Sequence, residues 1–366
     1  MNIKIKKSLF EKHLSNITKA ITNNPALTSL NGILFKVTQD SIIMTASDGV
    51  LSIKETLLVN DDVTIIKEGT ILIPGKMLIG IIKKQSSEIE LKASDTTLSI
   101  YSAGSSFKLN LMDAEDYPII DFDLSGDDLV LEGSEFKKVI KDVAFASSEN
   151  NRRIILNGVN IIAKNKRLRV SATDSYRLAT SRMDTISEND FNITILTKNI
   201  KDFIPSSLKG EVKIKVDESK INIENDSSVI QSRLIDGIYP ELSRLIPKEY
   251  NYKLEIDSRE LSNLIDKAIV VSSSDAKTVK LEIREGKLHI ESKQEEVGNS
   301  HVETENFTWE GNTMFSIAFD SKFMKDALRT FSGKVVVRFI GELKPFVIMG
   351  ESNKSLVQLV LPHRGY

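Results

Sequence analysis

The sequence predicts an α+β protein made of three similar units, each with two helices and antiparallel sheets of short strands. Two observations lead to this prediction. One order of helix-like and strand-like patterns occurs three times along the 366 residues, and apolar and polar residues alternate between the helix patterns. Such alternation is typical of strands that are buried on one face.

The first helix of each unit is predicted from apolar residues spaced three or four apart. The three copies of this pattern span 6–21, 133–146 and 257–271. Phe10, Phe136 and Leu261 occupy matching places in them, 126 and 125 residues apart. Recurrence at a nearly constant period indicates repeated domains rather than chance spacing.

The second helix of each unit follows a short strand, and a proline closes the unit. The second-helix patterns span 73–84, 196–207 and 319–330, and the closing prolines are Pro118, Pro240 and Pro362. Successive closing prolines are 122 residues apart. With polar stretches near 121–128 and 247–253, this spacing predicts domains at 1–124, 125–250 and 251–366.

The composition excludes several classes of site. Cysteine is absent, which removes disulfides, thiolate metal sites and cysteine nucleophiles. No apolar run approaches the ~18 residues of a membrane span. The charged N-terminal segment has no apolar stretch behind it that would make a secretory signal. We therefore expect a cytoplasmic protein without membrane attachment.

The charge is unevenly distributed along the chain. The net charge is −2, yet the basic and acidic residues of six segments around the helix patterns sum to +10, which leaves −12 on the rest; the segments are 6–21, 73–84, 133–146, 197–209, 257–271 and 320–334. Basic helices on an acidic body are expected of a protein that meets phosphates with one surface. Lysine is also common on any solvated helix face, so the uneven charge alone does not distinguish a phosphate-binding surface from an ordinary one.

The stretch "SATDSYRLA" at 171–179 is the strongest candidate for an active site. Its polar residues are Thr173, Asp174, Ser175, Tyr176 and Arg177. The stretch "TASDGVLS" at 45–52 partly repeats it, and Asp48 lies 126 residues before Asp174. An echo at the repeat period favours a structural turn, because aspartate side chains often bond the backbone of turns.

Motifs of cofactor and metal sites are missing from the sequence. The stretch "GTILIPGK" at 69–76 lacks the spacing and the hydroxyl residue of a phosphate-binding loop. The four histidines, His13, His289, His301 and His363, lie in separate segments without metal-ligand spacing. We therefore expect no metal and no cofactor.

The three-unit organisation and three motifs make the chain resemble one protein family. The motifs are "SATDSYRLA", "IYPELSRLIP" at 238–247 and "LVLPHRGY" at 359–366. Together they resemble the bacterial DNA sliding clamps, the beta subunits of DNA polymerase III, over the whole chain. The resemblance implies three clamp-type domains, and a head-to-tail homodimer that closes into a ring around double-stranded DNA without sequence preference. Helices would line the ring and sheets would form its outside.

The resemblance also implies the partners of such a ring. It would tether the catalytic subunit of DNA polymerase III and other replication and repair proteins, which gives processivity, and a clamp loader would open it. Short peptides of these partners would bind a pocket between the second and third domains. The matching residues are Leu156, Thr173, Tyr176, Arg177, Leu178, Pro240, Arg244, Leu245, Phe346, Leu361, Pro362, His363 and Arg364.

Two departures from the family pattern affect this pocket. Ser175 and Tyr176 stand where the family commonly has Gly-His, and the end of the chain reads Leu-Pro-His-Arg in place of Met-Pro-Met-Arg. The peptide preference is therefore left open.

By the same resemblance, helix lysines would face the DNA and two apolar pairs would join the subunits. The lysines are Lys12, Lys76, Lys138, Lys198, Lys201 and Lys322. Phe107 and Leu109 of one subunit would meet Val270 and Val271 of the next.

Two other interpretations stay open at this stage. One is an enzyme that uses Asp174, Ser175, Tyr176 and Arg177, although no histidine or lysine base lies near them in the sequence. The other is a monomeric three-domain scaffold that forms no ring. An effect on polymerase processivity would exclude the enzyme, and a dimer in solution would exclude the monomer.

Overall fold

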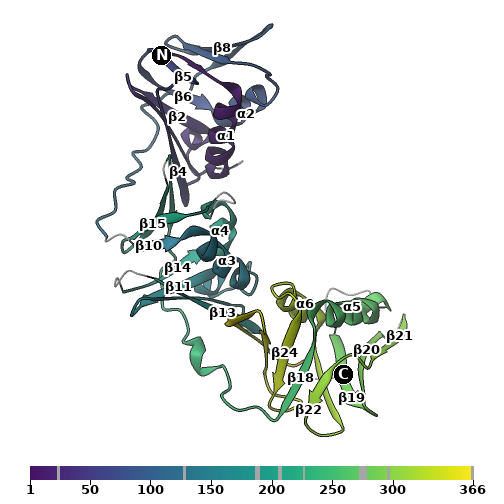
Figure 1. Cartoon of the computed structure of the whole chain (residues 1–366). Helices are drawn as coiled ribbons and strands as arrows, with labels where there is room; N and C mark the ends of the chain where they lie inside the picture. The colour runs from purple at the N-terminus through teal and green to yellow at the C-terminus, as the bar shows by residue number, and fades with distance from the viewer. Residues whose placement is uncertain are drawn as a thin grey trace. The chain divides into compact units, whose positions relative to one another are not determined.

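The computed structural model describes residues 1–22, 25–126, 129–185, 190–204, 208–225, 227–271, 278–294 and 297–363. In these ranges the order of helix, strands, second helix and strands occurs three times (Figure 1). The helices are α1 (Lys7–Ile17), α2 (Gly75–Ile82), α3 (Gly133–Ala144), α4 (Thr197–Phe203), α5 (Ser258–Ala268) and α6 (Ser321–Leu328). Each lies within a predicted helix pattern, which confirms the prediction.

The helices follow the local rules of the sequence. In α5, Leu261 and Ile265 lie four residues apart and are both buried, as expected of one apolar face. The Asp257 side chain accepts backbone N–H bonds at the start of α5, and Asp320 does the same for Lys322 at the start of α6. These are N-caps. Helices α1 and α2 lie side by side, as do α5 and α6 (Figure 1).

Contacts divide the chain into two compact units. Unit 1 comprises Met1–Ser134 and Asn199–Leu234, and unit 2 comprises Glu135–Lys198 and Ile235–Tyr366. Within the described residues each unit contains two antiparallel sheets.

The sheets of unit 1 have five and eight strands among the residues described. In spatial order the first contains β5 (Val63–Lys67), β1 (Asn2–Ile5), β7 (Ile89–Ala93), β8 (Thr97–Ser102) and β9 (Ser105–Asn110). The second contains β10 (Leu129–Glu132), β15 (Glu211–Val216), β16 (Lys220–Asn225), β17 (Ser228–Arg233), β4 (Leu51–Leu58), β3 (Ser41–Ser47), β2 (Gly32–Val37) and β6 (Gly69–Pro74).

The sheets of unit 2 have nine and four strands over the same described ranges. The first contains β14 (Phe191–Leu196), β11 (Gly158–Lys164), β12 (Arg167–Thr173), β13 (Arg177–Asp184), β26 (Asn353–Val360), β25 (Phe346–Gly350), β24 (Lys334–Phe339), β18 (Tyr252–Asp257) and β22 (Thr308–Glu310). The second contains β21 (Gly298–Thr304), β20 (Lys287–Gln294), β19 (Thr278–Arg284) and β23 (Phe315–Asp320).

Strand pairing explains why the predicted middle domain, 125–250, is shared between the two units. Its strand β17 pairs with β4 of the first predicted domain, and its strand β13 pairs with β26 of the third. Each large sheet therefore continues from one predicted domain into the next.

A buried polar cluster in unit 1 supports the first of these junctions. His13 on α1 places Nδ1 2.5 Å from Glu55 Oε2, and the Ser228 hydroxyl donates to Glu55 Oε1 at 2.6 Å. Glu55 is fully buried and His13 nearly so. Both carboxylate oxygens thus have a partner, as a buried acid requires.

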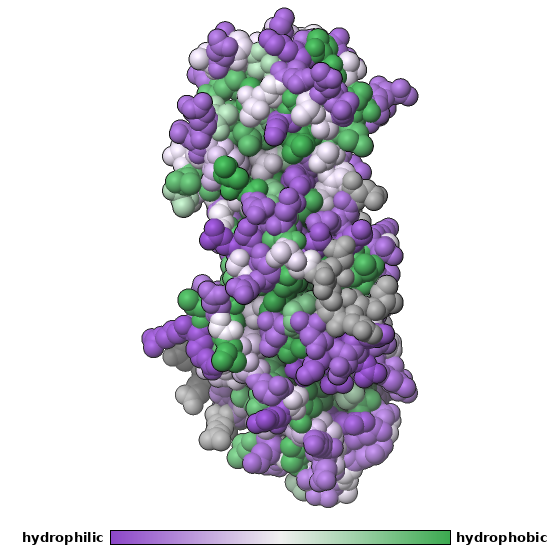
Figure 2. All heavy atoms as spheres, turned by 90° about the vertical axis from the view of Figure 1, so that its left-hand side faces the viewer, coloured by the Kyte–Doolittle hydropathy of each residue, from purple (hydrophilic) through white to green (hydrophobic). Residues whose placement is uncertain are grey.

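The surface is mixed in character. Hydrophilic residues predominate on the face drawn in Figure 2, and hydrophobic residues form separate groups between them. In the part of the chain that the structure describes, no helix is long and apolar enough to cross a membrane.

Candidate functional site

The stretch at 171–179 folds into a tight turn between β12 and β13. Asp174 Oδ1 accepts hydrogen bonds from the backbone N–H groups of Tyr176 and Arg177, both at 2.9 Å. Ser175 has a φ of 82°, in the left-handed region that favours glycine. This explains why glycine would suit the position.

The first repeat contains the same turn. Asp48 Oδ1 accepts from the backbone N–H groups of Val50 and Leu51, at 2.9 and 2.7 Å. Gly49 has a φ of 91° and takes the place of the serine. The prediction that Asp174 is a turn residue is confirmed.

Arg177 is the most restrained side chain of the turn. It donates to Asp174 Oδ2 at 3.0 Å and to Asp326 Oδ2 at 2.7 Å. Its guanidinium also lies 4.6 Å from the ring centroid of Phe323 and 5.3 Å from that of Phe145, distances at which cations and rings attract. The side chain is 8% exposed. Arg177 therefore links β13 to α6, and its charge is already paired.

The same contacts weaken the enzyme interpretation. The backbone of the turn uses one oxygen of Asp174, and Arg177 uses the other. A general base needs an oxygen free to take a proton. Asp174 therefore fixes the conformation of the β12–β13 turn and the position of Arg177.

Tyr176 is the exposed member of the turn, with 63% of its surface accessible. Its ring stacks on Phe323 of α6, with centroids 6.4 Å apart and planes 25° apart. Its carbonyl accepts a bond from the Leu361 N–H at 2.9 Å. The stacked rings of Tyr176 and Phe323 thus form an aromatic surface beside the end of β26, which we call the Tyr176 shelf.

An apolar cluster lies next to this shelf. Strand register places Leu178 beside Leu359 on β26, and Leu359 beside Val347 on β25. The buried members of the cluster are Ile155, Leu156, Leu178, Tyr239, Leu242, Val347 and Leu359, and Leu361 packs against them. Three predicted pocket residues, Leu156, Leu178 and Leu361, therefore share one apolar surface.

The segment 239–246 crosses the same face of the sheet. The Tyr239 hydroxyl accepts a bond from the Thr173 N–H at 3.0 Å, and burial raises the pKa of Tyr239, so the phenol stays neutral. A small pocket of about 50 Å³ lies where this segment passes over β11, β12 and β13, and Pro240 is among its lining residues. The next residues, Arg244 and Leu245, are exposed.

The structure places other predicted pocket residues differently. Phe346 is fully buried and packs on Phe319 and Phe339, with ring centroids 5.5 and 5.4 Å away. It lies on the opposite face of β25 from Val347, because successive strand residues alternate. The structure therefore does not bring Phe346 to the cluster, and Val347 takes that place.

The end of the chain is described as far as residue 363. Pro362 is partly buried and His363 is exposed, with the His363 N–H donating to the Ala318 carbonyl at 2.7 Å. This bond keeps the segment beside β23. Arg364 lies outside the described residues.

Several residues of this surface were not predicted from the sequence. They include Ile155, Tyr239, Leu242, Phe323, Val347, Met349 and Leu359. Tyr239 belongs to the motif at 238–247, and the alternation of apolar residues along β25 was the available signal for Val347 and Met349. Only folding brings Phe323 of α6 to Tyr176.

All six predicted DNA-facing lysines have exposed side chains. Lys12, Lys76 and Lys201 belong to unit 1, and the other three to unit 2. Lys138 forms an ion pair with Asp142 at 3.0 Å. Burial raises the pKa of Asp142 despite this lysine.

The predicted interface residues lie at accessible places. Phe107 and Leu109 are on β9, an outer strand of its sheet, and Phe107 is 38% exposed. Val270 and Val271 end η5 (Ile269–Val271), and Val270 is 79% exposed.

Two of the four histidines come together although their segments are separate in the sequence. His289 on β20 and His301 on β21 lie with their rings 5.0 Å apart. The strand pairing β20–β21 brings them to one face.

Comparison with protein families gives a consistent result along the chain. Residues 1–121 match the N-terminal domain of the DNA polymerase III beta subunit, residues 130–241 its central domain, and residues 243–364 its C-terminal domain.

Individual proteins match over their whole length. The beta sliding clamp of Mycoplasmopsis pulmonis is 32% identical over 375 residues, and that of Staphylococcus aureus 31% over 378, with full coverage of both chains. Among solved structures, the beta subunit of Streptococcus pyogenes DNA polymerase (25% identical) and the DNA polymerase sliding clamp of Bacillus subtilis (27%) each superpose with a TM-score of 0.94 and full coverage.

Proposed function

Because the chain belongs to the family of DNA polymerase III beta subunits, the bacterial beta sliding clamps, we propose that two copies close head to tail around duplex DNA. The protein is a DNA sliding clamp of replication and is not an enzyme. Its clamp domains extend over 1–124, 125–250 and 251–366, and it acts in the cytoplasm. The ring tethers the polymerase and its other partners, and the clamp loader opens it.

The partner-binding site is the surface made by the apolar cluster and the Tyr176 shelf. The observation that supports it best is the shared face of β13, β26 and β25, where Leu178, Leu359 and Val347 lie in register. An aliphatic side chain of a partner peptide would rest there, since such anchors seek apolar pockets with few polar groups. Exposed Tyr176, Arg244 and Leu245 form its rim.

Substituting the rim tests this assignment. Tyr176→Ala and Arg244→Ala are each expected to reduce the free energy of peptide binding by about 1–2 kcal/mol, as interface anchors do. Titration of a labelled clamp-binding peptide measures the effect. Arg167→Ala is a matched control, because Arg167 is also exposed and lies at the opposite end of β12 from the turn. Unchanged affinity in both rim variants, with dimerisation intact, would place the site elsewhere.

DNA would be held by the exposed helix lysines. They would meet phosphates, which carry no direct sequence information. Contacts of this kind weaken as salt rises, because each neutralised phosphate releases counterions.

The ring would close through β9 of one copy and the η5 region of the next. Such an interface joins two different surfaces, and a heterologous contact closes when its rotation brings the last subunit back to the first. The exposed apolar side chains Phe107 and Val270 are the proposed centre of each surface.

A further inference from the structure

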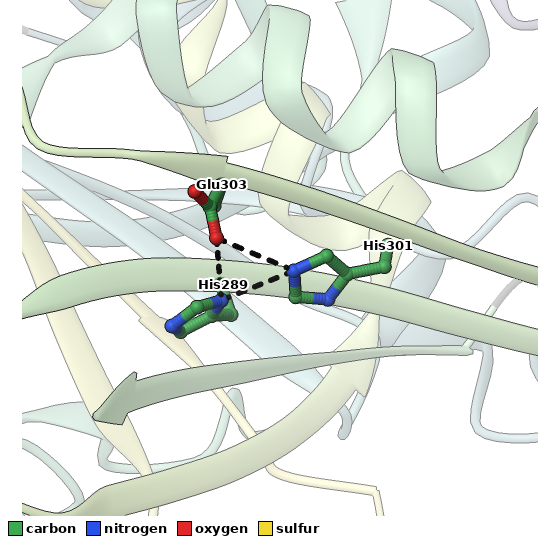
Figure 3. Close-up of side chains that lie close together, drawn as sticks. All are labelled: His289, His301 and Glu303. Atoms are coloured by element: carbon green, nitrogen blue, oxygen red, sulfur yellow. Dashed lines mark hydrogen bonds and ion pairs between the residues drawn. The ribbon is translucent and has the colours of Figure 1, made fainter. Parts of the chain in front are cut away.

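On the hairpin of β20 and β21 we propose a binding site for a zinc-type divalent cation, formed by His289, His301 and Glu303 of a single chain. Figure 3 shows the three side chains converging on one point from two neighbouring strands. The ligand atoms are His289 Nδ1, His301 Nε2 and Glu303 Oε2. None of the three residues belongs to the partner-binding surface.

The spacing of the three atoms suits a tetrahedral ion. The two imidazole nitrogens lie 3.3 Å apart, and each lies 3.6 Å from the Glu303 oxygen. A tetrahedral zinc ion with bonds of about 2.0–2.2 Å separates its ligand atoms by about 3.3–3.6 Å. An ion therefore fits among them with little movement of the side chains, and water would take the fourth position.

The surrounding groups orient two of the ligands, His301 and Glu303, for this role. When His301 Nε2 binds a cation, its Nδ1 carries the proton and donates to Glu291 Oε1, which lies 3.1 Å away. Arg284 holds that carboxylate at 3.0 Å. A carboxylate behind a metal-bound histidine fixes the ring and strengthens the ligand.

Lys287 orients the carboxylate of Glu303 in a similar way. Lys287 donates to its Oε1 at 2.5 Å, which leaves Oε2 directed at the histidines. This contact fixes the orientation of the carboxylate, as a partner behind a metal ligand does.

His289 is the buried ligand of the site. Its side chain is 5% exposed, and its Nε2 is buried without a hydrogen-bond partner among the described residues. Nδ1 is therefore the one polar atom through which this buried ring meets its neighbours. Two imidazoles and one carboxylate favour zinc or a similar transition-metal ion over magnesium or calcium, which prefer oxygen ligands.

Zinc titration of the full-length protein tests the site. After chelator treatment and dialysis, calorimetry with Zn²⁺ alone is expected to show one ion per chain. His301→Ala and Glu303→Gln should each weaken binding at least about 100-fold, and Glu291→Gln about 10–100-fold as the loss of an orienting carboxylate does. His363→Ala is the matched control, since His363 is also exposed, and it should bind zinc as the original protein does.

A second readout separates ligand loss from misfolding. Zinc should raise the thermal unfolding midpoint of the original protein and of His363→Ala, because a ligand that binds only the folded state stabilises it. It should leave the midpoint of His301→Ala unchanged, while circular dichroism shows the same fold. Absence of binding by the original protein up to about 1 mM Zn²⁺, or unaltered binding by His301→Ala, would overturn the proposal.

Discussion

Replacing both Val270 and Val271 with aspartate is expected to yield a folded monomer. Val270 is 79% exposed, so a charge there costs the single chain little. At a closed interface the two carboxylates would lose water without a partner, which is strongly unfavourable. We expect the dimer dissociation constant to rise at least about 100-fold, equivalent to about 2.7 kcal/mol.

Analytical ultracentrifugation at low micromolar concentration measures this change. Val59→Asp serves as the control, since Val59 is 47% exposed and lies outside the proposed interface; it should remain dimeric. A Val270/Val271 variant that sediments as the dimer would show that η5 is not the contact.

The second large effect is expected at the buried cluster of unit 1. In Glu55→Leu, His13 loses the carboxylate that lies 2.5 Å from its Nδ1, and the Ser228 hydroxyl loses its acceptor. Leaving a buried polar group without its hydrogen-bond partner costs about 1–3 kcal/mol, whereas replacing both partners with apolar residues can be nearly neutral. Glu55→Leu should therefore be much less stable than the double variant His13→Leu/Glu55→Leu.

Urea unfolding followed by circular dichroism compares the three proteins. The midpoint should fall most in Glu55→Leu and recover in part in the double variant. If Glu55→Leu unfolded at the same urea concentration as the original protein, the cluster would contribute little to the junction of β4 and β17.

The helices and the turn at Asp174 could be predicted because their signals are local. Apolar residues three and four apart mark α5 whatever it packs against. The echo between Asp48 and Asp174 predicts one turn twice, and both aspartates make the same pair of backbone bonds.

Part of the apolar cluster could be predicted from the sequence, and strand geometry explains why the rest could not. Leu156, Leu178 and Leu361 are in the apolar cluster, whereas Phe346 lies on the other face of β25. Because side chains alternate along a strand, an error of one residue moves the side chain to the opposite face. The resemblance did not determine the alignment there to within one residue.

Features that depend on non-local pairing were not accessible from the sequence. His289 and Glu303 are opposite each other only because β20 and β21 pair in this register. The continuation of a sheet from β4 into β17 likewise joins segments more than 170 residues apart. Spacing rules for metal ligands on helices or in short loops do not detect such pairs.

The central claim is that a closed ring keeps this protein on DNA by topology. The protein is loaded on a circular duplex and separated by gel filtration, at salt that abolishes its binding to short linear duplexes, before and after a single restriction cut. The proposed ring predicts that it stays with the intact circle, since weak phosphate contacts are screened but the ring cannot leave, and that it slides off the ends once the circle is cut. Protein that remained bound to the cut DNA at that salt would contradict the claim, because retention would then come from direct contacts.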